Sequence, residues 1–389
     1  MIEQTADGQV VVDGYTFPPF DLLRLLRTVF LLNPGESFGV FTDLPDPREV
    51  VGFAYLEKDG YGPQKHAYKT LYQGLVAARA ELDLKDVAFY GYEEVGGSNL
   101  DLPETVLTPD GEEIALRDAL KRHTIVLYMG TYSATAPITA LAKEMQFRGA
   151  TLHGTNDTVL ASGLAVDYED VSARAERLRA GMTRADSMRM EWDVAGRRVA
   201  LTLRLGQQEA QKSHGLVRTL GDVANLPAGE VYYVPKGAEG LMPIQFEDEA
   251  KTIAVFNVED RGITGLEQFV RGDESHVRRF LEMIEFDPNA GQLTELGLGT
   301  QELPWAGTDI QDEKIIGTAH VATGRSDHLG GDISSASFKD KKNAYHNDIL
   351  YTPVKTPEID LVRVTMQRGG EETLILQNYV PSEFIRKLL

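Results

Sequence analysis

The residues best suited to catalysis lie close together in the last third of the chain. Imidazole nitrogens and carboxylate oxygens are the ligands that a catalytic divalent metal ion takes in proteins. The chain has only eight histidines in 389 residues, and some of them fall among carboxylates in this one stretch. The candidate residues there are Glu295, Glu313, His320, His346 and Asp348. Their types and proximity predict a metal site.

The spacing of these residues indicates that strands carry them. His346 and Asp348 are separated by one residue, and residues two apart in a strand face the same side. His320 lies in an alternating segment, 317–324, that ends at a glycine. The alternatives are a surface pair for His346 and Asp348 and a satisfied structural role for His320. The short separation of the two motifs along the chain favours a shared metal.

Two glutamates also need an explanation, because they lie within short apolar segments. Glu295 stands within 293–299, and Glu230 stands within 225–235. Burying a glutamate is costly unless it is paired or bound to a metal ion. Both glutamates are therefore candidate ligands.

The composition is that of a soluble globular protein, and it excludes several kinds of site. Lys and Arg number 39 and Asp and Glu number 59, and the resulting net charge of −20 argues against binding nucleic acid or an anionic membrane. The absence of cysteine excludes disulfides, thiolate catalysis and cysteine-based zinc sites. There is no signal-peptide pattern or long apolar stretch, so we expect a cytoplasmic protein.

The chain is long enough for two domains, and its pattern changes near residue 165. Short apolar segments alternate with amphipathic helices over 1–164, which predicts an α/β domain with a largely parallel sheet. A helix over 168–182 and two alternating segments around a glycine turn at 195–196 follow. We therefore expect an α+β domain over 165–389 that is rich in antiparallel strands and carries the metal.

Four strings in the second half of the chain come in the order found in one protein family. They are NLPAGEVYYVP, TELGLGT, DEKIIGTAHVATG and HND. In these strings the chain resembles the thermophilic metalloaminopeptidases, the group of aminopeptidases T and S, over roughly residues 150–389. The resemblance implies five metal ligands: Glu230, Glu295, His320, His346 and Asp348.

This resemblance also implies an activity and a cofactor. It implies two divalent metal ions, zinc, cobalt or manganese, bridged by Glu295, that activate water against the N-terminal peptide bond. The substrate would be a peptide or another small molecule. Glu313 is a candidate general base, with helix capping or solvent exposure as the alternative. Relatives in the family are dimers, so a homodimer is expected.

The chain departs from the family pattern at one functional position. Asp327 stands where the peptidases have a tyrosine, seven residues after His320. Arg325 or His328 is a candidate to supply a donor or charge to the transition state in its place, with an ordinary loop as the alternative. A polar, lysine-rich segment at 338–343 is predicted to be an inserted surface loop.

Two other functions remain open from the sequence. The chain also resembles, more distantly, the 2,5-dihydroxypyridine dioxygenases, which hold one iron(II) with two histidines and one aspartate. His320, His346 and Asp348 would form that set here, with Glu230 and Glu295 as structural neighbours. The third alternative is a metal-binding protein without catalytic activity. Retention of both glutamates favours the dinuclear peptidase.

Overall fold

The computed structural model describes residues 2–5 and 8–389, and contacts between residues divide the chain into two units. Unit 1 comprises Met1–Ser172, His214–Ala228 and Leu303–Asp312. Unit 2 comprises Ala173–Ser213, Gly229–Glu302 and Glu313–Leu389. Two later segments thus return to unit 1 after the chain has entered unit 2, whereas the sequence suggests one boundary near residue 165.

Unit 1 is built around a mostly parallel sheet. Its strand order is β13–β9–β8–β4–β5–β6–β7, with parallel pairs from β13 to β5 and antiparallel pairs beyond. Every residue of β4 and β8 is buried, as expected for central strands that are covered on both faces. The strands are β4 (Ser37–Leu44), β5 (Asp86–Glu93), β6 (Thr105–Leu107), β7 (Glu113–Ala115), β8 (Ile125–Tyr128), β9 (Arg148–Thr151) and β13 (Val223–Asn225).

Two apolar clusters cover the two faces of this sheet. Ile125 and Leu127 belong to one cluster and Val126 and Tyr128 to the other, because alternate residues of a strand face opposite sides. A small antiparallel sheet consists of β1 (Ile2–Gln4), β2 (Val10–Val12) and β3 (Tyr15–Phe17). The helical segments are α1 (Leu22–Phe30), η1 (Pro47–Glu57), α2 (Gly62–His66), η2 (Ala67–Tyr72), α3 (Gln73–Ala78), α4 (Leu116–Leu120), α5 (Thr135–Met145), α6 (Asp157–Ala161) and α9 (Asp309–Asp312).

Unit 2 contains two antiparallel sheets. The first has the order β17–β16–β15–β11–β10–β21–β22–β23, and it includes the hairpin predicted around 195–196. Its strands are β10 (Ser187–Val194), β11 (Arg197–Arg204), β15 (Gly237–Gln245), β16 (Ile253–Glu259), β17 (Gly262–Arg271), β21 (Ile359–Arg368), β22 (Glu371–Gln377) and β23 (Val380–Pro381). The second has the order β12–β14–β18–β19–β20. Its strands are β12 (Gln211–Ser213), β14 (Glu230–Tyr233), β18 (Leu293–Gly299), β19 (Ala319–Gly324) and β20 (His346–Tyr351).

Short helices and one anchored loop complete unit 2. The polar segment at 338–343 is held by Asp287, whose carboxylate accepts hydrogen bonds from the backbone N–H of Lys339 and Asp340 and from the side chain of Asn343. The helical segments are α8 (Glu274–Phe286), η3 (Pro288–Gly291), η4 (Asp327–Leu329), η5 (Ser335–Ser337), η6 (Lys341–Asn343) and α10 (Glu383–Leu388), and α7 (Tyr168–Met182) contributes residues to both units.

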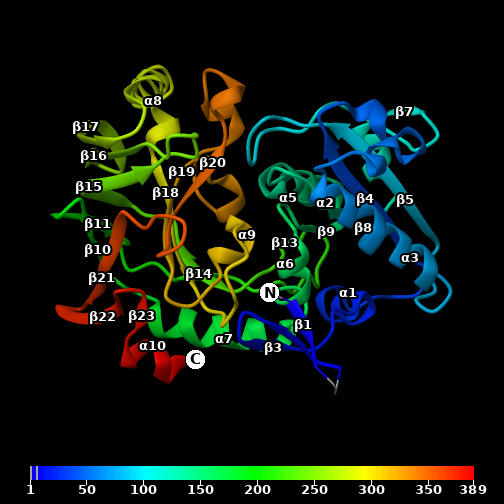
Figure 1. Ribbon diagram of the computed structural model, residues 1–389, viewed down its shortest axis with the longest axis horizontal. Coiled ribbons are helices and arrows are strands. Elements are labelled where there is room, and N and C mark those ends of the chain that lie inside the picture. Colours follow the sequence, from blue (N-terminus) through cyan, green and yellow to red (C-terminus); the bar gives the residue numbers. More distant parts are fainter. Residues whose placement is uncertain (1, 6–7) are drawn as a thin grey trace. The chain divides into compact units, whose positions relative to one another are not determined.

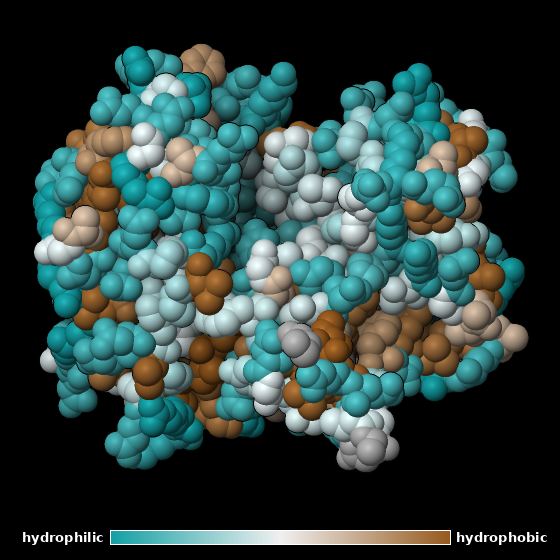
Figure 2. All heavy atoms as spheres, viewed as in Figure 1, coloured by the Kyte–Doolittle hydropathy of each residue, from teal (hydrophilic) through white to brown (hydrophobic). Residues whose placement is uncertain are grey.

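The predicted fold class is confirmed in outline. Figure 1 shows β4, β5, β8 and β9 side by side in the blue-to-green part of the chain and β18, β19 and β20 side by side in the yellow-to-orange part. Polar residues cover most of the face seen in Figure 2, and apolar residues form small separate groups on it. In the part of the chain that the structure describes, no helix combines the length and apolar character needed to cross a membrane.

Candidate metal centre

Four adjacent strands of the five-stranded sheet carry the predicted metal ligands. Glu230 is the first residue of β14, and Glu295 lies in β18, which pairs with β14. His320 lies in β19, and both His346 and Asp348 lie in β20. Because β18, β19 and β20 are neighbours in the sheet, residues far apart in the sequence meet on it. The structure thus brings all five sequence-predicted ligands together.

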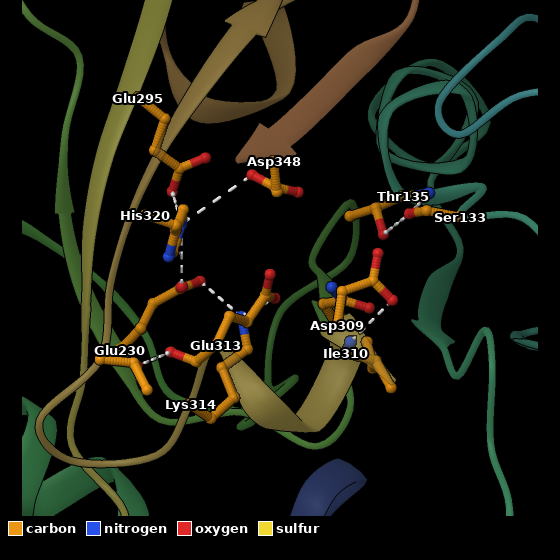
Figure 3. Close-up of polar contacts among 12 residues, drawn as sticks. Ser133, Thr135, Glu230, Glu295, Asp309, Ile310, Glu313, Lys314, His320 and Asp348 are labelled. Carbon is orange, nitrogen blue, oxygen red and sulfur yellow. Dashed lines mark hydrogen bonds and ion pairs between the residues drawn. The ribbon is translucent and has the colours of Figure 1, made fainter. Parts of the chain in front are cut away.

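The ligand atoms have the spacing of a metal site. Figure 3 shows carboxylates approaching His320, whose Nε2 lies 3.7 Å from Glu230 Oε2, 3.7 Å from Glu295 Oε1 and 3.9 Å from Asp348 Oδ1. His346 Nε2 lies 3.0 Å from Glu295 Oε2 and 3.2 Å from Asp348 Oδ1. Atoms bound at about 2.1 Å to one metal ion lie about 3–4 Å from each other, which is the separation seen here.

A hydrogen bond to the backbone fixes which nitrogen of His346 faces the carboxylates. His346 Nδ1–H donates to the carbonyl oxygen of Arg325 at 2.6 Å. In the neutral ring, Nε2 then has a lone pair and no hydrogen, and it faces oxygens of Glu295 and Asp348. Because a lone pair and carboxylate oxygens repel each other at this distance, a proton or a metal ion must lie between them. A histidine oriented by a carbonyl in this way is typical of a metal ligand.

Charge interactions within the cluster raise the pKa values of its histidines and lower those of Glu295 and Asp348. Burial disfavours the charged form of each group, but the interactions between the groups outweigh it. Hydrogen bonding and attraction to Glu295 raise the pKa of His320 to about 9, and Asp348 raises the pKa of His346 well above its usual value. The same contacts lower the pKa of Glu295 to about 2 and that of Asp348 below its usual range. Protons on the histidines thus supply positive charge until a metal ion displaces them.

A glycine allows His320 to pack closely against the neighbouring strand. Gly297 of β18 is the cross-strand partner of His320, and a Cβ atom on Gly297 would lie 2.1 Å from Cε1 of the imidazole. No other residue leaves that space free. His320 Nδ1 is buried without a hydrogen-bond partner among the described residues. Packing against Gly297 therefore helps to orient this ring.

Glu313 and Lys314 complete the buried cluster. The Lys314 side chain is 1% exposed, and its Nζ lies 2.9 Å from Glu230 Oε1 and in contact with Glu313 Oε1. Burial disfavours the ammonium charge, but attraction to Glu230 and Glu313 outweighs it and raises the pKa of Lys314. Burial, opposed by Lys314 and reinforced by Asp348, raises the pKa of Glu313 to about 8. The alternative of a solvent-exposed Glu313 is wrong, since its side chain is 7% exposed.

The segment that follows β19 contacts the centre through the backbone of Arg325. The Arg325 guanidinium donates to both carboxylate oxygens of Asp327, at 2.7 and 3.1 Å, while its carbonyl accepts the hydrogen bond of His346. His328 packs edge-on against His346, with ring centroids 4.9 Å apart. This segment therefore supports His346, and the transition-state role predicted for the Arg325 guanidinium stays a prediction.

Three features of the site are absent from the sequence-based prediction. They are the buried ammonium of Lys314, the close approach at Gly297 and the orienting carbonyl of Arg325. The first two leave a signal, since a lysine follows a candidate glutamate directly and a glycine interrupts an apolar strand. The carbonyl leaves none, because every residue has one.

The residues present fit a divalent metal ion. In three overlapping groups of the described residues, the ligand atoms all lie within 4.8 Å of one another. These groups are Glu230–Glu295–His320, Glu295–His346–Asp348 and Glu313–His320–Asp348. Glu230 Oε2 is in addition buried without a hydrogen-bond partner among these residues. Mixed imidazole and carboxylate ligands suit iron, zinc, cobalt or manganese.

No family model matches the chain, and no curated protein matches it in sequence. Among solved structures, it is similar to a 2,5-dihydroxypyridine dioxygenase from Pseudomonas putida KT2440, with a TM-score of 0.60. The two chains are 15% identical, and the similarity covers 93% of this chain and 95% of that one. At this level of identity, the likeness shows a shared fold.

These findings correct the family predicted from the sequence. The assignment to the metalloaminopeptidases is wrong, and so is the prediction of a peptidase or other hydrolase, because the structural likeness is to a dioxygenase. The four strings do not identify the reaction, for a physical reason. They encode the strands that hold the ligands, including Gly297 and the spacing of His346 and Asp348. Such a scaffold serves more than one reaction.

Proposed function

We propose that the chain is an iron(II)-dependent dioxygenase that opens a dihydroxylated aromatic ring, with His320, His346 and Asp348 as the iron ligands. Two imidazoles and one carboxylate are the donor set of non-haem iron oxygenases, which keep positions open for substrate and dioxygen. The observation that carries the proposal is the convergence of these ligand atoms, with Nε2 of His346 oriented by a carbonyl. The fold shared with a dioxygenase supports it.

The proposed reaction needs no reductant besides the substrate. One ring bond breaks, both atoms of dioxygen enter the product, and the ring supplies the electrons that reduce dioxygen. Iron(II), when bound, supplies the binding and activation of dioxygen. The protein must therefore hold the ligands in place and accept the proton of a substrate hydroxyl group.

Glu313 is the proposed acceptor of that proton. An oxygen of Glu313 lies within 4.8 Å of ligand atoms of both His320 and Asp348, and its side chain is almost fully buried. A carboxylate beside the metal site, shielded from water, can serve as a general base for a hydroxyl group bound there. Lys314 favours the charged form of Glu313, but burial outweighs it and raises the pKa of Glu313 to about 8, so the ionised carboxylate is a stronger base than an exposed glutamate.

The remaining glutamates have supporting roles in this proposal. Glu295 directs one oxygen toward His320 and the other toward His346, so it orients both rings and balances their charge. Glu230 is paired with Lys314. In this proposal both glutamates contact the iron ligands and do not themselves bind the iron.

The proposal is tested by oxygen uptake with iron-loaded protein. Metal-free protein is reconstituted with iron(II) without air and mixed with 2,5-dihydroxypyridine, 1,4-dihydroxybenzene or catechol. We expect oxygen uptake equal to the loss of ring absorbance, with two labelled atoms in the product when the dioxygen carries ¹⁸O. His346→Ala should abolish uptake together with iron binding.

Glu313→Gln separates proton transfer from metal binding. This variant should keep its iron while kcat falls by about 10²–10⁴, the usual contribution of general base catalysis. Iron bound in full without oxygen uptake on any of the three rings contradicts the proposal. That result would favour a metal-binding protein without catalytic activity.

The partners predicted from the sequence enter the proposal in modified form. A small aromatic molecule takes the place of a peptide as substrate. A net charge of −20 continues to argue against nucleic acid and anionic membranes as partners. The homodimer and the cytoplasmic location stay predictions, and light scattering of the purified protein tests the first of them.

A further inference from the structure

Tyr232 lies on the face of the five-stranded sheet that carries the metal ligands. It comes two residues after Glu230 in β14, so the two side chains point to the same face. Figure 3 shows the Glu230 carboxylate on this face extending toward His320. The next residue, Tyr233, points to the opposite face, where its hydroxyl donates to the Met182 carbonyl at 2.5 Å. Of these two tyrosines, Tyr232 is therefore the one that faces the metal centre.

The strand register puts Tyr232 beside His320. Tyr232 pairs with Gly297 of β18, and Gly297 pairs with His320 of β19, so the three residues form one row across the sheet. Neighbouring strands lie about 4.8 Å apart, and the glycine in the middle of the row has no side chain. The His320 ring leans over Gly297, since a Cβ atom there would lie 2.1 Å from the imidazole. No side chain of β18 in this row therefore separates the tyrosine from the imidazole.

The Tyr232 hydroxyl is a donor without a partner. The residue is partly exposed, and its hydroxyl makes no hydrogen bond with any residue that the structure describes. In contrast, the buried hydroxyls of Tyr233 and Tyr351 each donate to a backbone carbonyl. Burial disfavours the phenolate, and the charges of Glu295 and Glu230 add to this effect, so the pKa of Tyr232 is raised. The phenol therefore keeps its hydrogen at neutral pH and can donate it to a bound molecule.

From this geometry we propose that Tyr232 binds the substrate oxygen that loses its proton to Glu313. Both residues lie beside His320, Tyr232 through the row across the sheet and Glu313 through its carboxylate. The oxygen carries negative charge once its proton is gone, and a hydrogen bond to a charged acceptor is stronger than one between neutral groups. Tyr232 keeps its own hydrogen throughout. The inference rests on the proposed function for the substrate class, a dihydroxylated ring, and adds the residue that stabilises the ionised ring.

Binding of 4-nitrocatechol to zinc-loaded protein tests this inference without turnover. Zinc(II) has no redox chemistry, and the absorbance of 4-nitrocatechol reports the ionisation of its hydroxyl groups. We expect wild-type protein, freed of unbound zinc, to bind the probe in its ionised form. Tyr232→Phe removes the hydroxyl and keeps the ring. It should weaken binding about 10- to 100-fold, the strength of a hydrogen bond to a charged group. The pKa of the bound probe should rise by about 1–2 for the same reason.

Tyr233→Phe is the matched control from the same strand. It removes the hydroxyl that bonds the Met182 carbonyl on the opposite face, so urea unfolding should show a loss of stability. Its affinity for 4-nitrocatechol and the pKa of the bound probe should equal those of wild type. Tyr232→Phe should show the reverse, with wild-type stability, because its hydroxyl bonds no described residue. All three proteins should hold the same amount of zinc.

Several results would overturn the inference. They are an unchanged affinity and probe pKa in Tyr232→Phe, and the absence of 4-nitrocatechol binding by zinc-loaded wild type. Loss of zinc from Tyr232→Phe would make the phenol a metal ligand instead, and failure of this variant to fold would show that its hydroxyl is needed by the protein itself.

Oxygen uptake decides the proposed reaction separately. A protein that binds 4-nitrocatechol through Tyr232 but takes up no oxygen with any of the three rings keeps this inference and loses the proposed reaction. Oxygen uptake in wild type together with unchanged probe binding in Tyr232→Phe gives the opposite result. The two failures are therefore distinguishable.

Discussion

Each unit buries carboxylates, and those of the metal centre in unit 2 are satisfied in a different way from Asp43 in unit 1. In unit 1, Asp43 is 1% exposed and accepts hydrogen bonds from the Gln64 amide at 2.8 Å and the Tyr128 hydroxyl at 2.9 Å. It also accepts hydrogen bonds from the backbone N–H groups of Thr131 and Tyr132, at 2.8 and 3.1 Å. Donors from the chain itself thus satisfy this charge without an ion.

In the metal centre of unit 2, two carboxylates face an imidazole nitrogen of His346 that carries a hydrogen only when the ring is charged. Glu295 and Asp348 approach Nε2 of His320 and His346, which in the neutral ring of His346 is an acceptor. The difference shows that burial of a charge does not by itself mark a functional site. A functional site is marked instead by buried carboxylates that need a cation. This need distinguishes the metal centre from Asp43, whose hydrogen bonds come from the chain.

The largest expected effect is the loss of a ligand from the metal centre. His346→Ala should weaken metal binding by more than about 100-fold, since structural zinc sites gain about 10–16 kcal/mol from four ligands. Calorimetric titration with manganese(II) or iron(II) measures the affinity. If this variant binds metal as tightly as wild type, the contrast between the two units is lost.

A substitution of the buried carboxylate in unit 1 should lower the free energy of unfolding without changing metal binding. Asp43→Asn replaces one carboxylate oxygen with an NH₂ group, which then faces donors in either orientation of the amide. We expect the free energy of unfolding to fall by about 2–3 kcal/mol, the cost of leaving a buried donor unsatisfied. Urea unfolding measures this, and the metal content should equal that of wild type. A drop in metal content would show that Asp43 is coupled to the centre.

Histidines in the two units should respond to pH with opposite sign. Burial lowers the pKa of His123 in unit 1 to about 4. The unfolded chain therefore binds this proton more readily, so the stability contributed by His123 is present above about pH 6.5 and is lost as the pH falls toward 4. About 2 kcal/mol should be lost between pH 7 and 5, and His123→Asn should remove that part of the slope in urea unfolding.

His320 should show the reverse in metal-free protein. Its pKa is raised to about 9, so its contribution to stability is present below about pH 6.5 and is lost as the pH rises through 9. Unfolding of wild type and His320→Asn in the presence of a chelator measures the difference between pH 7 and 9. Equal slopes for the two proteins would contradict the charge interactions described for the centre.

The smallest expected effect concerns the glycine beside His320. Gly297→Ala should shift the imidazole and weaken metal binding by about tenfold, as losses of outer supporting contacts do. The control is Gly265→Ala in β17, where an added Cβ meets nothing within 4 Å. Both variants are compared by the same metal titration. Equal affinity of the two would show that the close approach at Gly297 does not hold the ligand.

Much of the fold follows from local pattern, and the exceptions have physical reasons. The apolar runs at 37–44 and 124–129 predict strands, and β4 and β8 lie there with every residue buried. In contrast, β17 (Gly262–Arg271) is not predicted. It is an edge strand, and most of its residues are partly or fully exposed, so it shows no apolar alternation.

For the site, the sequence by itself determined the ligand types and the strands that carry them. His346 and Asp348 share a face because side chains in a strand alternate with a period of two, which is a local rule. Only the tertiary structure decided that Lys314 lies beside Glu230 and that a carbonyl orients His346. Those decisions depend on pairing between distant strands and on the paths of loops, which no local pattern encodes.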